Sequence, residues 1–510
     1  MGFTDLKNPK SVQGSDSVYI DGPTTGFGEV RIASITPQGQ GDFVYGVSDK
    51  IFTTSSFAGG SVTSVNGMCE LESGTDPAGS ATVQLRRGLK YRSGQASLMR
   101  ITALYGTPDA GNAQFVGAGN SECGYFIGYF GTNFGILHSQ TGQREVRTYT
   151  VSAGAGTANL TVTLDGDSIS VPVTGGGDTS QTAYQLSLAD YSQVGRGGWL
   201  VDVIGSTVYF ISARSSSEYT GSYSVAGSTV AGTFTRLLAG ENQTNTFIPS
   251  SSFNVDRLDG TGPTEMTIDT SKGNVFEIAF QYLGFGNASF SIEDPQTGKF
   301  VEFHKVINAN NRTTPVLKNP NVNALATSAN IGGTTSTTLK TVSIGAFIEG
   351  QVIPLDPKFG KTYSYTTLGT LATYKPFVLF KVNRLYRDKS CFGELDILRV
   401  SGTNTTNNAS LTVGIFLDAE VSGDVNYQYV DQQNSITSYA QVDPATQTIT
   451  NLASLQPLYE ITIGPDFSRT EDLINLNLAF GVGRPILLAV KTTGNINTAG
   501  SVSVNWFEQQ

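Results

Sequence analysis

The sequence predicts an all-β protein of two jelly-roll-like β-sandwich domains, with a small α+β insertion interrupting the first. Three observations lead to this prediction. Residues 253–305 can be read as three antiparallel strands with both connections visible. Strand patterns then recur along most of the chain, with glycine and small polar residues between them in place of helices. The composition agrees, because 59 of the 510 residues are glycine, about 12% against a usual ~7%, and only 15% are charged.

The stretch 253–305 follows the period of two that a half-buried strand requires. Between residues 273 and 283, phenylalanine, isoleucine and tyrosine side chains fall on one face, while glutamate and glutamine fall on the other. Gly284 and Gly286 end this strand. The sequence Asp-Pro-Gln-Thr-Gly at 294–298 supplies the turn between the two strands that follow. We therefore expect an antiparallel meander with one buried face.

The remaining strand patterns divide the chain into four parts. Strand signals strengthen from residue 60 to residue 137, and the stretch 353–360, which contains two prolines, reads as a linker to a second all-strand domain. The predicted organisation is an N-terminal arm (1–20), a first β-sandwich (21–143 with 244–350), an inserted α+β module (144–243) and a C-terminal β-sandwich (361–510).

The module at 144–243 is predicted from two local patterns. Alternating strands flank a tight Asp-Gly-Asp turn at 165–167, which indicates a hairpin. The sequence Asp-Thr-Ser-Gln at 178–181 has the form of a capping box, and apolar residues follow at helical spacing, so a helix is expected there. Because sandwich-like strand patterns lie on both sides, we place the module in a loop of the first domain.

The sequence offers little catalytic chemistry. The two histidines, His138 and His304, each lie on a predicted strand, where a structural role is the more common one. Cys69, Cys123 and Cys391 are widely spaced, which is typical of free thiols and not of a disulfide framework or a zinc site. We predict no catalytic residue, no cofactor and no enzymatic activity. Paired carboxylates for glycoside hydrolysis stay open, since their separation is invisible in a sequence.

A group of carboxylates is the candidate metal site. Asp256, Asp259 and Asp269 lie close together in the sequence beside a Gly-Thr-Gly-Pro stretch. Clustered oxygens of this kind suit Ca²⁺. The alternative, which we favour because the spacing matches no calcium-loop signature, is a set of turns in which each aspartate bonds to nearby backbone.

Aromatic residues are the candidate ligand contacts. Tyr427 and Tyr429 stand on a polar loop of the C-terminal domain, and five aromatic residues crowd the window 125–134. The tyrosines are either ordinary exposed side chains or a surface on which carbohydrate stacks. The group at 125–134 is expected in the core, with the same stacking surface as its alternative.

Charge and hydropathy exclude several partners. The formal net charge is -10 and lysine and arginine form no cluster, which argues against nucleic acid as a partner. No apolar run of ~18 residues predicts a membrane-spanning helix, so membrane insertion is not expected. The first residues carry no apolar segment of a signal peptide, and synthesis in the cytoplasm is expected.

Three motifs stand in order along the chain: ECGYFIGY at 122–129, FNVDRLDGTGP at 253–263 and QYLGFG at 281–286. With FGILH at 134–138, they resemble virion structural proteins of marine tailed phages and of large double-stranded DNA viruses of algae. The module is similar to an α+β module that recurs in phage tail and other virion proteins, and the end of the chain from residue 484 looks like the closing strands of that group.

The resemblance implies a fibre, spike or capsid-associated protein of the virion, made in the host cytoplasm, with no cofactor and no catalytic residues. We therefore expect a viral structural protein that contributes to host attachment, and the alternatives are a carbohydrate-binding adhesin module and an extracellular polysaccharide hydrolase. The expected partners are other copies of the chain, with a homotrimer favoured by analogy to virion appendages, other virion proteins contacted through residues 1–20, and host surface glycans.

Overall fold

The computed structural model describes residues 34–174, 177–227, 229–351, 356–476 and 478–509. The predicted arm at 1–20 and residues 353–355 of the predicted linker lie outside these ranges. The all-β prediction is confirmed, because the described residues form strands β1 to β35, one α-helix and three short 3-10 turns. The helix is α1 (Thr179–Ser187), and the turns are η2 (Ser250–Ser252), η3 (Leu452–Ser454) and η4 (Ile474–Leu476).

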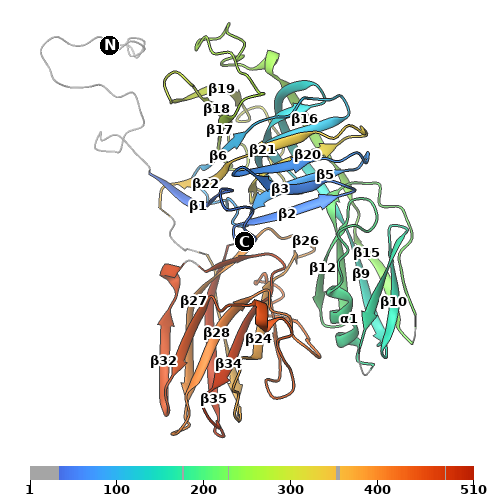
Figure 1. Cartoon of the computed structure of the whole chain (residues 1–510), viewed down its shortest axis with the longest axis vertical. Helices are drawn as coiled ribbons and strands as arrows, with labels where there is room; N and C mark the ends of the chain where they lie inside the picture. Colours follow the sequence, from blue (N-terminus) through green and yellow to red (C-terminus); the bar gives the residue numbers. More distant parts are fainter. Residues whose placement is uncertain (1–33, 175–176, 228, 352–355, 477, 510) are drawn as a thin grey trace, which may run out of the picture.

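Two large antiparallel sheets pack face to face in the upper part of Figure 1. The six-stranded sheet has the order β1 (Ile35–Asp42), β22 (Ser343–Glu349), β6 (Ser97–Ala103), β17 (Asn274–Phe280), β18 (Ala288–Glu293) and β19 (Phe300–Val306). The ten-stranded sheet runs β12 (Trp199–Ile204), β13 (Thr207–Ser215), β9 (Asn133–Ala153), β8 (Gly124–Phe130), β7 (Asn112–Gly119), β20 (Asn323–Asn330), β5 (Ser80–Leu85) and β2 (Phe52–Phe57), with β15 (Ala231–Leu238) and β16 (Glu241–Pro249) also paired to β9. A smaller sheet beside them consists of β21 (Thr338–Thr341), β4 (Met68–Glu72) and β3 (Ser61–Val65).

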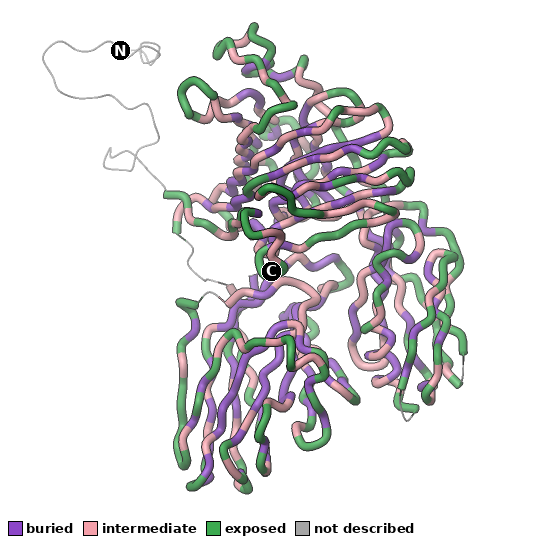
Figure 2. The backbone as a smooth tube through the Cα atoms, viewed as in Figure 1, coloured by how far each residue is buried: buried purple, intermediate pink, exposed green. Residues whose placement is uncertain are grey.

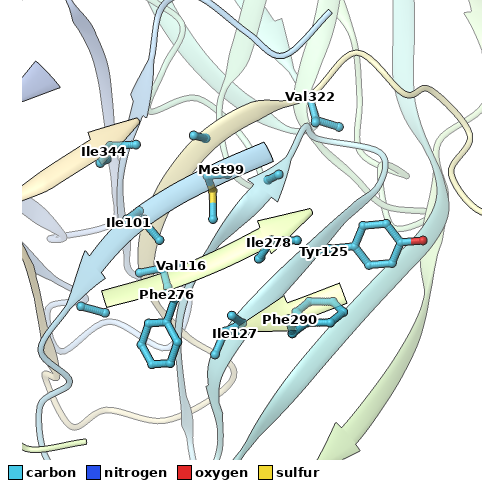
Figure 3. Packing of buried hydrophobic residues seen from close by; sticks show 14 of the residues in the cluster. Met99, Ile101, Val116, Tyr125, Ile127, Phe276, Ile278, Phe290, Val322 and Ile344 are labelled. Carbon is cyan, nitrogen blue, oxygen red and sulfur yellow. The ribbon is translucent and has the colours of Figure 1, made fainter. Parts of the chain in front are cut away.

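The predicted meander is confirmed as β17, β18 and β19. Phe276 lies opposite Ile292 and Ile278 opposite Phe290, and these four side chains are fully buried. Figure 3 shows Phe276, Ile278 and Phe290 beside residues of β6, β7 and β8, so the meander supplies one side of the core between the two sheets. The pattern at 273–283 therefore alternates for the expected reason: one face of the strand packs on the core.

Strand β9 joins the module to the first β-sandwich, which is the first region of the chain. Its first half pairs with β8 and β16, and its second half pairs with β13 and β15. The predicted boundaries at 143/144 and 243/244 fall inside β9 and β16, which are continuous strands. The module thus extends the ten-stranded sheet, and a second sheet of β11 (Asp167–Val173), β10 (Ala158–Leu164) and β14 (Ser224–Ala226) lies with it at the right of Figure 1.

The predicted hairpin and helix of the module are confirmed. The turn between β10 and β11 has positive φ at Asp165 (52°) and Gly166 (91°), as a two-residue hairpin turn requires. Asp178 caps α1 by accepting hydrogen bonds from the backbone N–H groups of Ser180 (2.7 Å) and Gln181 (3.1 Å). The Gln181 side chain donates to the Thr174 carbonyl (3.3 Å), so the predicted capping box forms only its first half.

The C-terminal residues form two antiparallel sheets around their own core. One contains β23 (Lys358–Tyr365), β35 (Gly500–Gln509), β27 (Glu394–Asn404) and β32 (Phe467–Asp472), with β33 (Ala479–Gly481) paired to β27. The other contains β29 (Gln428–Tyr429), β30 (Thr437–Gln441), β24 (Lys375–Val382), β34 (Ile486–Thr492), β28 (Leu411–Leu417) and β31 (Tyr459–Ile463). A short ribbon of β25 (Leu385–Tyr386) and β26 (Lys389–Ser390) lies near the module.

The sheet that contains β24, β28 and β34 is buried on both faces. Phe380, Ile415 and Leu488 point into the core between the two C-terminal sheets, whereas Leu379 and Leu487 point to the opposite side. Side chains of residues 419–427 and 442–455 and of the module pack on that opposite side. These strands are buried at almost every position and are purple along most of their length in Figure 2, which explains why their sequences are largely apolar.

Candidate functional site

A cleft with a volume of about 670 Å³ lies between the outer face of β2, β5 and β20 and the beginning of β12. Its floor exists because β5 alternates: Ala81, Val83 and Leu85 enter the core, so Ser80, Thr82 and Gln84 face the cleft. Its wall comes from residues 192–200 and 213–214 of the module. The volume falls within the ~300–1,000 Å³ of small-molecule sites.

Hydroxyl groups form a row across the floor. The strand register places Ser55 of β2 beside Thr82 of β5, and Thr82 beside Thr327 of β20. The Oγ atoms of Thr82 and Thr327 are 2.8 Å apart and share a hydrogen bond. Each hydroxyl can donate and accept, so the row offers a ligand several groups of either kind.

An aromatic ring lies at one end of the floor and packs directly against two glycines. Phe126 of β8 lines the cleft, and it faces Gly117 and Gly119 of β7 across the strand pair. A Cβ atom at Gly117 or Gly119 would come within 2.6 or 2.3 Å of the Phe126 ring. These glycines are therefore required by the close approach of the ring. Phe126, expected in the core from its sequence neighbours, is half-buried and borders the cleft.

Arg214 is the charged side chain of the cleft lining. Its guanidinium donates to Ser80 Oγ and lies 5.3 Å from the centre of the Phe57 ring. No carboxylate within the described ranges forms an ion pair with it, and burial lowers the pKa of the guanidinium. Gln193 ties the same wall to the floor by donating to the Ser56 carbonyl at 2.8 Å. The cleft thus holds one positive charge that no described carboxylate neutralises.

Two buried polar clusters fasten the C-terminal sheets to the rest of the chain. In the first, Ser390 donates to Glu122 Oε1 (2.7 Å) and accepts from Arg144 Nε (3.1 Å). In the second, the Asp202 carboxylate of β12 is paired with the Lys381 ammonium of β24, and the two side chains are only 5% and 7% exposed. Lys381 also donates to the Val203 carbonyl at 2.9 Å. Burial lowers the pKa of Lys381.

The three aspartates of the predicted metal site are used in separate turns. Asp256 accepts from the backbone N–H of Leu258 (2.8 Å) and from both N–H (2.9 Å) and hydroxyl (2.7 Å) of Thr264. Asp259 and Asp269 each accept from the residue two positions ahead. Within the described part of the chain, no three His, Cys, Asp or Glu side chains are grouped to hold a metal ion. Each of the three carboxylates thus accepts hydrogen bonds within its own turn.

The prediction that Tyr427 stands exposed on a polar loop is wrong. Its side chain is 3% exposed, with the Lys381 ammonium 4.1 Å from its ring centre, and burial raises the pKa of its hydroxyl. Its backbone carbonyl accepts from the Gly205 N–H of the module at 2.9 Å. Tyr429 is half-buried. Tyr427 is therefore part of the contact between the module and the C-terminal sheets, where no carbohydrate can stack on it.

The histidines and cysteines have structural surroundings. His138 is bonded through Nε2 to the Val316 carbonyl (2.9 Å) and stacks on Tyr125 at 4.5 Å between ring centres. Burial lowers the pKa of His138 to about 4. His304 accepts from the Asn254 N–H at 3.2 Å. All three cysteines are free and buried, and burial raises the pKa of the Cys123 thiol to about 11.

Sequence reasoning missed the cleft. The alternation at 80–85 was visible as a polar face, but a polar face on a strand is normally a solvated one. The wall comes from residues more than a hundred positions away, so no local signal brings Arg214 to Ser80. The residues missed are Ser55, Phe57, Thr82, Thr327 and Arg214.

Comparisons with known proteins give distant likenesses only. No known protein family and no curated protein matches the chain. One similar solved structure comes from work on endo-acting O-glycanases that human gut bacteria use to initiate mucin breakdown. The alignment covers 62% of this chain and 100% of that chain, with 9% sequence identity and a TM-score of 0.27. Peanut lectin with a nine-residue peptide aligns with 62% of this chain and 98% of its own chain, at 11% sequence identity and a TM-score of 0.25. A structure described as a triple jelly-roll fold and turret assembly in an archaeal virus aligns with 94% of this chain and 97% of its own chain, at 7% sequence identity and a TM-score of 0.15. These TM-scores are too low to support a function.

Proposed function

We propose that this chain is a structural protein of a virus particle, located at the virion surface or in an appendage such as a fibre or spike. The observation that carries the proposal is how the motifs that resemble virion proteins are used. Tyr125 of the first motif packs against Phe290 of the meander, with 5.9 Å between ring centres, and the neighbouring Glu122 bonds to Ser390. Phe253 of the second motif packs against Phe303 at 4.9 Å. Tyr282 of the third donates to the Leu317 carbonyl at 3.1 Å. The motifs thus serve packing and joining, as a structural role requires.

The carboxylates that could suggest a hydrolase also have structural partners. Glu394 and Asp396 lie two residues apart on β27, and burial together with the nearby Glu394 raises the pKa of Asp396 to about 6. Both are nearly inaccessible, at 4% and 5% exposed. Glu394 pairs with Lys90 (3.3 Å) and Asp396 with Arg87 (3.3 Å). These pairs connect the C-terminal sheets to residues 87–90 of the first sandwich, which is a structural use of both carboxylates.

Mass spectrometry of purified virus particles tests the proposal. We expect peptides from across the chain, at a copy number comparable with that of other structural proteins. These peptides should still be found after a protease treatment that removes host contaminants from the sample. Host proteins of similar abundance in the lysate serve as the control, because they should be depleted on purification. Absence of the chain from particles would contradict the proposal.

We further propose that the chain acts as a homo-oligomer, with a trimer favoured by analogy to other virion appendages. Strand β32 ends its sheet and pairs with β27 on one side only. Phe467 on β32 is 58% exposed. Natural proteins cover such edges, and a second copy is one way to do so. Light scattering at micromolar concentration should give three times the chain mass of 54.0 kDa. A measured mass of 54.0 kDa would show a monomer and contradict the oligomer.

Within the described ranges, no helix has the length and apolar character needed to cross a bilayer.

A further inference from the structure

We propose that the cleft between β2, β5 and β20 and the module binds an acidic saccharide, a sugar chain that carries carboxylate or sulfate groups. This inference goes beyond the structural role proposed above and does not depend on it, because binding is a property of the isolated chain. Three features of the lining support it: the row of hydroxyls, the aromatic rings, and an arginine that no described carboxylate neutralises.

The hydroxyl row suits a ligand rich in hydroxyl groups. Ser55, Thr82 and Thr327 lie side by side across three strands, with their backbones at the strand separation of ~4.8 Å and the Thr82 and Thr327 hydroxyls 2.8 Å apart. Gln84 and Asn120 add amide groups to the same lining. A sugar hydroxyl both donates and accepts, and such a surface can satisfy it without a fixed pattern of donors.

The aromatic rings supply the apolar part of the site. Phe126 lies over the glycines of β7 at one end of the floor, and Phe57 lies under the Arg214 guanidinium at the other. Ligand sites commonly combine apolar and aromatic surface with a few placed polar groups. A sugar ring has an apolar C–H face and polar edges, so it can contact a phenyl ring and the hydroxyl row at once.

Arg214 selects for an anionic ligand. Charged side chains in recessed positions are normally paired, and Arg214 has a hydroxyl and an aromatic ring as its partners. The guanidinium keeps its charge and can bind a carboxylate or sulfate through two parallel hydrogen bonds. The protein as a whole has a net charge of -10, so general attraction cannot draw an anion to it. Recognition must therefore come from Arg214 itself.

The test measures binding of three probes to the full chain by calorimetry. The probes are a dextran oligosaccharide, the same oligosaccharide after sulfation, and an oligogalacturonate of equal length. We expect one or both acidic probes to bind with one site per chain, at least about tenfold more tightly than the neutral dextran. Whichever acidic probe binds better identifies the acid group. No binding of either acidic probe, or equal binding of the neutral one, would overturn the inference.

Matched variants locate the site. Arg214→Gln should weaken the acidic probe about tenfold and leave the neutral probe unchanged. Arg257→Gln removes the same charge from an exposed position outside the cleft, and it should leave both probes unchanged. Thr82→Val with Thr327→Val should weaken the acidic probe while preserving shape, and this pair keeps the test decisive if Arg214→Gln fails to fold. Binding that survives in both cleft variants would contradict the proposed site.

Hydrogen exchange gives an independent readout of position. The bound probe should slow exchange in peptides that cover β2, β5 and β20 and in residues 192–200, which line the cleft. Protection that appears only elsewhere would place the ligand at another surface and overturn the assignment. Presence or absence of the chain in purified particles has no bearing on this result, so the two proposals fail separately.

Discussion

Asp202→Asn is expected to destabilise the chain by about 3–5 kcal/mol, because it leaves a buried ammonium without its carboxylate. The Lys381 side chain is 7% exposed, and its other partners are the Val203 carbonyl and the Tyr427 ring. Neither partner carries a negative charge. The contact between the module and the C-terminal sheets should therefore open at lower urea concentration than in the parent protein.

The two tryptophans allow this to be measured on each side of the contact. Trp199 lies on β12 with Asp202, and Trp506 lies on β35 of the C-terminal sheets. Urea unfolding followed by fluorescence should show a lower midpoint in Asp202→Asn. Asp472→Asn is the control, since its pair with Arg399 is 65% and 51% exposed and contributes little to stability. Adding Lys381→Met to Asp202→Asn should restore most of the loss, and a failure of either comparison would show that the pair contributes little.

The second large effect is a dependence of stability on acid pH that His138 causes. Its pKa lies at about 4 in the folded chain, against an ordinary value of 6.5. Above pH 6.5 the imidazole is neutral in both states, so it adds no pH dependence. As the pH falls from 6.5 towards 4, only the unfolded chain takes up the proton. The free energy of unfolding should therefore decrease by up to about 3 kcal/mol over this range.

The His138→Gln variant isolates this contribution. Glutamine can still donate to the Val316 carbonyl but cannot be protonated, so the variant should lose less stability between pH 6.5 and 4 than the parent. The raised pKa of Asp396 acts in the opposite direction, since the folded state takes up that proton first. It is the same in both proteins and cancels in their difference. Equal slopes in parent and variant would show that His138 is not buried as neutral imidazole.

Patterns confined to neighbouring residues were predictable from the sequence. The meander follows from alternation and a five-residue turn, and the hairpin at Asp165 and Gly166 follows from the preference of those residues for positive φ. The α1 cap follows from Asp178, whose side chain reaches the next backbone N–H groups. In each case the interactions that form the element lie within a few residues of one another, so the sequence contains them.

Features that depend on distant partners were not predictable. Tyr427 has polar sequence neighbours and looks exposed, but Lys381 and the module cover it. The largely apolar sequences of β24, β28 and β34 indicate burial on both faces, yet they do not say that residues 419–427 and 442–455 supply the second cover. The cleft is the extreme case, because Ser80 and Arg214 belong to segments whose proximity only the assembled fold determines.

The continuity of β9 bears on how fast the cleft can be filled. The floor strands and the first strands of the wall belong to one hydrogen-bonded sheet, since β9 runs from β8 on one side to β13 on the other. Moving β12 and β13 away from the floor would require breaking ladder bonds, and residues 192–198 of the wall are tied to the floor by the hydrogen bond from Gln193 to the Ser56 carbonyl. A ligand therefore meets a slot of fixed width with its polar groups already in position, and little ordering is left for the encounter. Association should be governed by diffusion and orientation, with no gating step.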